Sequence, residues 1–271
     1  MPIDTPIGRN GWRQGSVLRQ ADHAKLDENI RSSLRLDASI VVVSHDCDVT
    51  NGSYEKEPTV ELFVVYPRTE KKGGRTFGKS PREIDFQIRV DGCDTSFIGH
   101  ASDRYHIDRR ILETITPDPQ SHLPSESVSL LRSWLAQRYN RSAFPDVFLN
   151  RLEQVKDNIE SILNREGAEI SAILIGIEPD DVDVREDESY KVNLYAVMPV
   201  NLYKQASLRT KAQLVIDQLG KLFRKCGGIQ LVDAEVRSEN EVTLDDMRYL
   251  KRFTTDYLSN KKSSSVFFPS T

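Results

Sequence analysis

Short apolar runs of strand length, separated by stretches rich in Gly, Pro and charge, dominate the N-terminal half and most restrict the folds open to this chain. Ile40–Val43 is followed by Thr59–Tyr66 and then by Glu83–Val90, where apolar and polar residues alternate. Alternation with a period of two is typical of a half-exposed strand. We therefore predict a β-rich N-terminal region built from these runs.

A helical middle follows this region. Ser125–Tyr139 begins with a residue suited to capping a helix and repeats apolar side chains at helical spacing, and Pro145 then prevents the helix from continuing. A second helix is predicted over Val147–Arg165 from the same periodicity. These apolar stripes indicate faces directed toward a core.

The last third alternates strand and helix patterns. Strands are predicted over Ile170–Ile177, Lys191–Val200 and Ile229–Val236, and helices over Ser207–Lys225 and from Thr243 to Ser259. The fold class is therefore α+β, with a β-rich N-terminal half, a helical middle and a C-terminal α/β layer with a mixed sheet. The corresponding regions are residues 1–122, 123–168 and 169–271, and together they can also form one domain.

Composition limits the class of protein. The 271 residues are 38% hydrophobic, which is enough for a sizeable core, and no run approaches the ~18 apolar residues of a membrane span. The start, MPIDTPIGRNGW, lacks the pattern of a signal peptide. The three cysteines are widely spaced and odd in number, which favours free thiols over a disulfide framework. We expect a cytoplasmic protein with no membrane partner.

The net charge of -4 conceals local basic stretches. Tyr66–Arg89 carries seven Lys or Arg against three acids, and Lys204–Lys225 carries six against one, whereas Glu178–Glu188 is acidic. Local basic surface of this kind predicts a nucleic-acid partner, DNA in particular, while the negative total argues against indiscriminate tight binding.

Reactive side chains gather directly after the most apolar strand. Ile40–Val43 runs into Ser44-His45-Asp46-Cys47-Asp48 and then a Thr-Asn-Gly turn. If the extended conformation continues, Ser44, Asp46 and Asp48 share one face, and Glu61 from the next strand can add a third acid. The structural alternative is that the acids cap the turn while His45 bonds to a backbone carbonyl.

Three kinds of chemistry are compatible with these residues. The first, slightly favoured, is hydrolysis of an N-glycosidic bond in DNA, with Asp46 or Asp48 orienting water and His45 donating to the leaving base; this needs no cofactor. Aromatic residues would form the pocket for the flipped base: Phe63, Phe77, Tyr105 and Tyr139.

The second is a nuclease in which Asp46, Asp48 and Glu61 hold Mg²⁺. The position two after Glu61 is Phe63 and not the Lys found in many restriction-type nucleases, so Lys79 or Arg82 would have to supply the cation. The third is a zinc site, whose possible ligands match no standard spacing: His45, Cys47, Cys93 and His100.

Two stretches interleave arginine with tyrosine. Arg104–Arg110 and Arg138–Arg141 combine cations for phosphate with rings for base stacking. The predicted substrate-binding residues are Lys79, Arg82, Arg104, Tyr105, Arg138, Tyr139 and Arg141. For Arg138, an interaction with the end of its own helix is an equally good explanation.

The motifs VVVSHDCD, EPTVEL, GKSPREIDF and WLAQRYNRSAFPDVF together resemble a family of mostly uncharacterised bacterial cytosolic proteins, which pair an SxDCD-like strand end with a downstream RYxRxxFPD segment. The resemblance covers Gly15–Leu152 and implies an association with mobile or anti-phage loci. It also implies one shared site formed by Asp46, Asp48, Glu61, Arg82, Arg138 and Arg141.

The prediction from the sequence is therefore an Asp-dependent bacterial hydrolase of antiviral defence that acts on DNA. Base excision is favoured over phosphodiester cleavage. The alternative is a non-catalytic subunit that binds nucleic acid or another protein, in which the SHDCD stretch only stabilises a turn.

Overall fold

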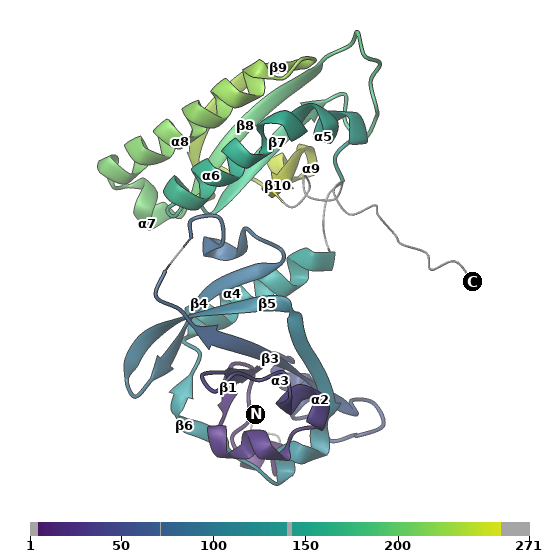
Figure 1. Ribbon diagram of the computed structural model, residues 1–271, viewed down its shortest axis with the longest axis vertical. Coiled ribbons are helices and arrows are strands. Elements are labelled where there is room, and N and C mark those ends of the chain that lie inside the picture. Colours follow the sequence, from purple (N-terminus) through teal and green to yellow (C-terminus); the bar gives the residue numbers. More distant parts are fainter. Residues whose placement is uncertain (1–4, 71, 140–142, 256–271) are drawn as a thin grey trace, which may run out of the picture. The chain divides into compact units, whose positions relative to one another are not determined.

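The structure of the protein is a computed structural model that describes residues 5–70, 72–139 and 143–255. Its contacts divide the chain into two compact units (Figure 1). Unit 1 comprises Met1–Lys71 and Arg82–Gln137, and unit 2 comprises Lys72–Pro81 and Arg138–Thr271. This division differs from the three sequence regions, because a short segment between two strands of unit 1 packs with unit 2.

Unit 1 is built around a closed barrel of six antiparallel strands in the order β1-β2-β3-β5-β4-β6. Its strands are β1 (Ser16–Leu18), β2 (Ser39–Val42), β3 (Thr59–Pro67), β4 (Glu83–Val90), β5 (Cys93–Asp108) and β6 (Pro117–His122). The predicted β-rich N-terminal half is thereby confirmed. The longest strand, β5, was not predicted from the sequence, because its many polar residues interrupt the alternation.

A two-residue turn joins β4 to β5. Val90 pairs with Cys93, and the two residues between them, Asp91 and Gly92, have φ angles of 50° and 79°. Positive φ at both central positions is the geometry of a type I′ hairpin turn, for which Asp-Gly is a preferred sequence. This dipeptide is the sequence signal that identifies β5.

The predicted helix over Ser125–Tyr139 is present as α4, and its Leu131 and Trp134 pack in one apolar cluster with side chains of the barrel strands. Its fully buried Trp134 stacks on Phe63 of β3, with ring centroids 5.6 Å apart. Gly99 on β5 makes room for this ring, since a Cβ there would lie 2.2 Å from Phe63 Cζ. Phe63 is therefore a core residue, and the prediction that it lines a base pocket is wrong.

Phe63 and Trp134 belong to one apolar cluster of unit 1. Short helical turns help to bury a second apolar cluster, which includes Trp12 and Leu112. They are α1 (Pro6–Arg9), η1 (Gln20–Lys25), α2 (Glu28–Arg31), α3 (Asp46–Val49) and η3 (Arg109–Glu113).

Unit 2 contains a four-stranded mixed sheet in the order β10-β7-β8-β9. Its strands are β7 (Ala172–Glu178), β8 (Tyr190–Met198), β9 (Ile229–Ser238) and β10 (Leu250–Phe253). β8 and β9 are parallel, so the chain must cross over between them, and α7 (Val200–Tyr203) and α8 (Ala206–Lys225) make this connection. The predicted C-terminal mixed sheet and its long helix are confirmed.

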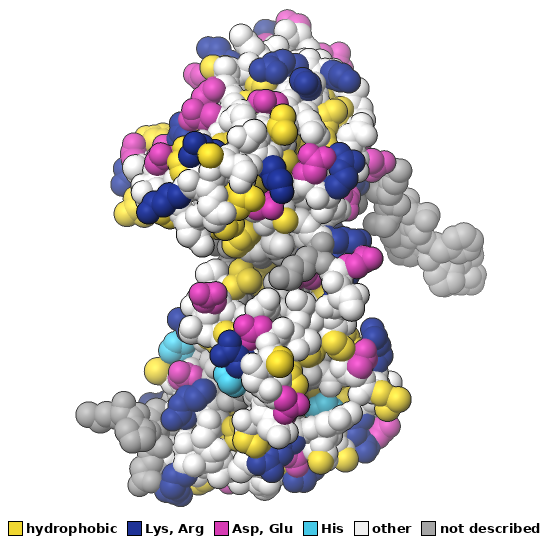
Figure 2. All heavy atoms as spheres, turned by 90° about the vertical axis from the view of Figure 1, so that its left-hand side faces the viewer, with side chains coloured by type: hydrophobic (Ala, Val, Ile, Leu, Met, Phe, Trp, Pro, Cys, Tyr) yellow, Lys and Arg dark blue, Asp and Glu magenta, His cyan; other side chains and the backbone are white. Residues whose placement is uncertain are grey.

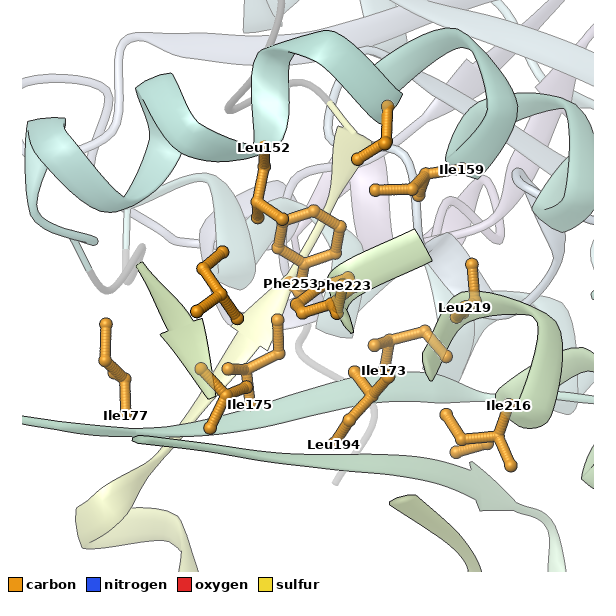
Figure 3. Packing of buried hydrophobic residues seen from close by; sticks show 14 of the residues in the cluster. Leu152, Ile159, Ile173, Ile175, Ile177, Leu194, Ile216, Leu219, Phe223 and Phe253 are labelled. Carbon is orange, nitrogen blue, oxygen red and sulfur yellow. The ribbon is translucent and has the colours of Figure 1, made fainter. Parts of the chain in front are cut away.

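Helices cover one face of this sheet and build the core of unit 2 (Figure 3). Phe148, Leu152 and Ile159 pack there against Ile175 and Phe223. The single helix predicted over Val147–Arg165 is wrong in detail, because the structure has α5 (Asp146–Leu152), the 3₁₀ turn η4 (Glu153–Val155) and α6 (Lys156–Glu166). The 3₁₀ turn keeps the three-to-four-residue spacing of the apolar side chains, so periodicity does not reveal it.

The helix predicted from Thr243 to Ser259 is wrong beyond its first turn. The N-cap of α9 (Asp246–Tyr249) is Asp245 and not the predicted Thr243, although the Asp246 N–H donates to Thr243 Oγ1 at 3.1 Å. The chain then becomes β10, which pairs with β7 from Leu250 to Phe253. Pairing with an otherwise open sheet edge thus overrides the local helical pattern, and residues 256–259 lie outside the described part of the chain.

At the opposite edge of the sheet, β9 carries a bulge. Leu231 pairs with Val192 and Asp233 pairs with Asn193, so Val232 is the extra residue and is 60% exposed. The carboxylate of Asp233 accepts the N–H of Ala234 at 2.8 Å. Bulges and side-chain caps of this kind protect an edge strand from further pairing.

Across the described residues, no helix has the length and apolar character needed to cross a membrane.

Candidate functional site

The SHDCD stretch does not continue as a strand. After β2 the chain turns at His45 into the single helical turn α3, and the N–H groups of Asp48 and Val49 donate to the His45 carbonyl. The prediction that Ser44, Asp46 and Asp48 share one strand face is therefore wrong. Asp residues favour the first turn of a helix, where their charge complements the free N–H groups, and this preference outweighs the extended pattern here.

His45 and Asp46 are both exposed at the start of this turn. His45 Nδ1 accepts the N–H of Cys47 at 3.4 Å, and a nitrogen that accepts carries no proton in the neutral ring. The ring proton is then on Nε2. Asp46 Oδ1 accepts the N–H of Gln14 at 2.7 Å, which fixes the orientation of the carboxylate.

Gln14 links this turn to the rest of unit 1. Its side-chain amide donates to the Val43 carbonyl at 2.8 Å and accepts from Arg132 of α4 at 3.1 Å. The end of β2, the α3 turn and α4 therefore all contact Gln14, in the segment before β1. Arg132 and Gln14 were not predicted as site residues, because they lie far from the SHDCD stretch in the sequence.

Arg109 holds the other end of the turn. Its guanidinium is fully buried and donates to four backbone carbonyls, those of Asp48, Val49, Asn51 and Ser53, at 2.7 to 3.2 Å. Cations are favourable where helical carbonyls point outward. Arg109 is thus a structural cation, whereas the sequence pattern predicted nucleic-acid contacts for the Arg104–Arg110 stretch.

Glu61 lies on β3 near the end of β2, and its N–H donates to Ser44 Oγ at 2.8 Å. Its carboxylate pairs with Arg104 at 2.9 Å, and both side chains are largely buried, with exposures of 19% and 16%. The structure therefore joins two predicted site residues, Glu61 and Arg104, as an ion pair. A carboxylate compensated in this way is not free to join an acidic metal site.

The metal-binding arrangements predicted from the sequence are not assembled. Within the described ranges, no three His, Cys, Asp or Glu side chains gather as a metal site. This applies to the Mg²⁺ set of Asp46, Asp48 and Glu61. It applies equally to the zinc set, in which His100 lies 3.3 Å from Glu83 while Cys47 and Cys93 are free thiols.

Tyr105 follows Arg104 on β5, so the two side chains point to opposite faces of the strand. Its hydroxyl lies 3.1 Å from Ser33 Oγ, on the side of the second apolar cluster. Arg82 is exposed and belongs to unit 1. The side chains of Arg138 and Tyr139, and all of Arg141, lie outside the described residues.

The basic loop between β3 and β4 is not the open surface that its composition predicts. Lys79 is 6% exposed, and its ammonium donates to Thr76 Oγ1, the Gly167 carbonyl and the Ile170 carbonyl. The pKa of Lys79 is lowered to about 7, mainly by burial and also by the charge of Arg252, while Glu169 opposes the shift. Lys79 is thus a buried contact of unit 2.

Two glycines complete this contact. The Gly73 N–H donates to the Asn164 carbonyl at 2.8 Å, and a Cβ at Gly73 would lie 2.4 Å from the Leu163 carbonyl oxygen. Gly74 approaches the Asn164 side chain equally closely. We call Lys72–Pro81 the docking segment, because it packs along the end of α6 and includes the 3₁₀ turn η2 (Thr76–Gly78).

The second basic stretch is exposed. On α7, α8 and their junction, six cations are at the surface and none forms an ion pair with a described residue: Lys204, Arg209, Lys211, Lys221, Arg224 and Lys225. We call this set the α8 basic face. Figure 2 faces the left-hand side of Figure 1, where α7 and the start of α8 lie, and shows cationic and acidic side chains interspersed on this side.

Comparisons of the chain with models of protein families, with curated proteins and with solved structures gave no match.

Proposed function

We propose that the protein binds nucleic acid through the α8 basic face. The observation that supports this most directly is the presence of six exposed cations, without acidic partners in the described chain, in a protein whose net charge is -4. Concentrated cations attract the phosphate backbone and release its counterions, and this supplies most of the affinity of nonspecific binding.

The test is fluorescence anisotropy with labelled DNA at several salt concentrations. Replacing all six cations by Gln should abolish binding at 50 mM salt and flatten the salt dependence. A control with the same change in net charge replaces six cations that already face acids: Arg35, Arg89, Arg110, Arg185, Lys191 and Arg248. An equal loss of DNA affinity in both variants would contradict binding at the α8 basic face.

For the reaction, we propose hydrolysis of an N-glycosidic bond in DNA at His45 and Asp46. The oriented Asp46 carboxylate has one oxygen without a partner among the described residues, and it can position water at the sugar carbon. The Nε2–H of His45 can hydrogen-bond to the departing base without giving up its proton. The water oxygen forms the new bond to the sugar carbon as the bond to the base breaks; Asp46 accepts a proton from this water, and the departing base takes a proton from solvent.

Base excision needs one carboxylate and one hydrogen-bond donor. Metal-dependent phosphodiester cleavage needs a cluster of acids, and among the described residues Asp46, Asp48 and Glu61 do not form one. The resemblance of the SHDCD and RYNRSAFPD segments to a bacterial family suggests cytoplasmic antiviral defence as the setting. Modified phage DNA is accordingly the first substrate to examine.

The assay treats plain and phage-modified DNA, each as a single strand and as a duplex, with the protein, with and without EDTA, and then with alkali. Breaks that require alkali and tolerate EDTA indicate base excision, whereas direct breaks that EDTA prevents indicate a metal-dependent nuclease. Asp46→Asn and His45→Gln should abolish the breaks. Cys47→Ser, in the same exposed turn, should leave them unchanged.

A specific observation favours a second candidate, a non-catalytic binding subunit. The polar groups of this turn have structural partners: Asp46 bonds to Gln14, His45 to Cys47, and the turn carbonyls to Arg109. In this case no breaks appear with any DNA, binding persists, and Asp46→Asn lowers only the melting temperature.

A further inference from the structure

A cleft of about 300 Å³ lies between the C-terminal half of α8 and strand β9. The helix contributes Asp217, Lys221 and Arg224, and the strand contributes Val232 and Asp233. The three helical residues are spaced by four and three, so they lie on one side of α8. The cleft therefore belongs to the α8 basic face but also carries two acids.

The shape of the cleft depends on two features of its walls. Gly220 has no side chain, and a Cβ there would lie 3.1 Å from Leu231 Cδ2, so the helix approaches the strand closely. Opposite, the bulge turns Val232 outward. The result is a cavity with a charged helical wall and an exposed apolar side chain on the strand.

The charges in the cleft are not neutralised by each other. Lys221 and Arg224 have no hydrogen-bond or ion-pair partner in the part of the chain that the structure describes. Asp217 Oδ1 accepts from Gln213 at 2.9 Å, and Asp233 Oδ1 accepts the N–H of Ala234. The cleft thus offers free cationic donors beside carboxylates that each retain one oxygen as an acceptor.

We propose that this cleft binds one nucleotide unit of a single-stranded nucleic acid. Lys221 and Arg224 contact the phosphate, the free carboxylate oxygens accept from N–H groups on the base edge, and Val232 contacts the base. In a duplex the Watson–Crick edges of the bases are paired and cannot donate to Asp217 and Asp233. The two carboxylates then only repel the phosphate charges of the duplex, and no hydrogen bond to a base offsets this repulsion. The proposal rests on the proposed function and adds the class of nucleic acid.

The experiment measures binding of a labelled single strand and of the matching duplex, by anisotropy over a range of salt. The cleft variant Lys221→Gln/Arg224→Gln is compared with Lys204→Gln/Lys211→Gln, which removes two exposed cations of the same face outside the cleft. For the cleft variant, the slope of log K against log salt for the single strand should become shallower by about 1.4, or 0.7 for each lost phosphate contact. The control should change it by less than half as much.

A third variant, Asp217→Asn/Asp233→Asn, tests the role of the acids. Binding of the duplex should tighten several-fold while binding of the single strand does not, so the preference for the single strand falls. Circular dichroism checks that each exposed substitution leaves the fold intact.

The outcomes separate this proposal from the proposed function. Equal losses in the cleft and control variants, or a strand preference that the Asn variant leaves unchanged, would overturn the cleft proposal while nucleic-acid binding stands. If the unaltered protein binds neither form of DNA, both proposals fail.

Discussion

Arg109 is a buried cation that faces carbonyl dipoles, with four backbone oxygens within hydrogen-bonding distance of its guanidinium. We expect Arg109→Met to lower the free energy of unfolding by at least about 3 kcal/mol, since several carbonyls lose their donor at once. Urea unfolding measures this. Arg110→Lys, at the exposed neighbour, should change stability by no more than about 0.5 kcal/mol; comparable losses at both positions would contradict the role given to Arg109.

Lys79 links stability to pH. The pKa of Lys79 is about 7 in the folded protein, and a lysine in an unfolded chain has a pKa near its ordinary value of 10.5. Between these two values the unfolded chain holds a proton that the folded chain has released. The free energy of unfolding therefore rises with pH in this window, with a slope approaching about 1.4 kcal/mol per pH unit.

This prediction is measured by urea unfolding at pH 7, 8 and 9 for the natural protein and for Lys79→Met. The difference between the two proteins cancels the titration of all other groups. Stability curves that run parallel over this range would mean that Lys79 remains protonated in its buried site.

At the scale of elements, the hairpin between β4 and β5 depends on one backbone conformation. Gly92 has a φ of 79°, and a Cβ there would meet nothing within 4 Å, so Gly92→Ala tests backbone strain alone. We expect a loss of about 1 to 2 kcal/mol in the free energy of unfolding.

Gly52→Ala is the matched control for the hairpin. Gly52 is equally unobstructed but lies outside the positive-φ region, so the change should be neutral or slightly stabilising. Thermal melting compares the two variants, and similar shifts would argue against the hairpin geometry.

Sequence patterns predicted the elements whose periodicity is local. β4, α4 and α8 match their predicted ranges within one or two residues, because each has a regular apolar stripe. β10 could not be predicted in this way, since only the open edge of β7 makes it a strand. For the candidate site, the proximity of Glu61 to the SHDCD stretch was predictable from neighbouring strands, whereas the helical turn and the contact from Arg109 depend on partners distant in sequence.

At the scale of the molecule, the two units have separate apolar cores, and both tryptophans, Trp12 and Trp134, lie in those of unit 1. Tryptophan fluorescence therefore reports on unit 1 alone, whereas circular dichroism reports on both. Phe148→Ala in unit 2 should cost about 3 to 5 kcal/mol. We expect a lower midpoint by circular dichroism and an unchanged midpoint by fluorescence.

The matched change in unit 1 is Phe63→Ala, which should shift the fluorescence midpoint directly. If Phe148→Ala moves the fluorescence midpoint as far as Phe63→Ala does, the two units unfold as one cooperative system.

The docking segment also imposes an order of events during synthesis. Lys79 and its acceptor Gly167 are 88 residues apart, and a ribosome adding about 5 to 20 residues per second needs roughly 4 to 18 seconds to cover that distance. Strands β1, β2 and β3 are made before Lys79, and β4, β5 and β6 are made within this interval, before the end of α6 exists. Until then, Lys79, Gly73 and Gly74 of the docking segment have no partners from the end of α6 to pack against. Unit 2 is therefore complete only when its later residues bind a segment that was synthesised seconds earlier.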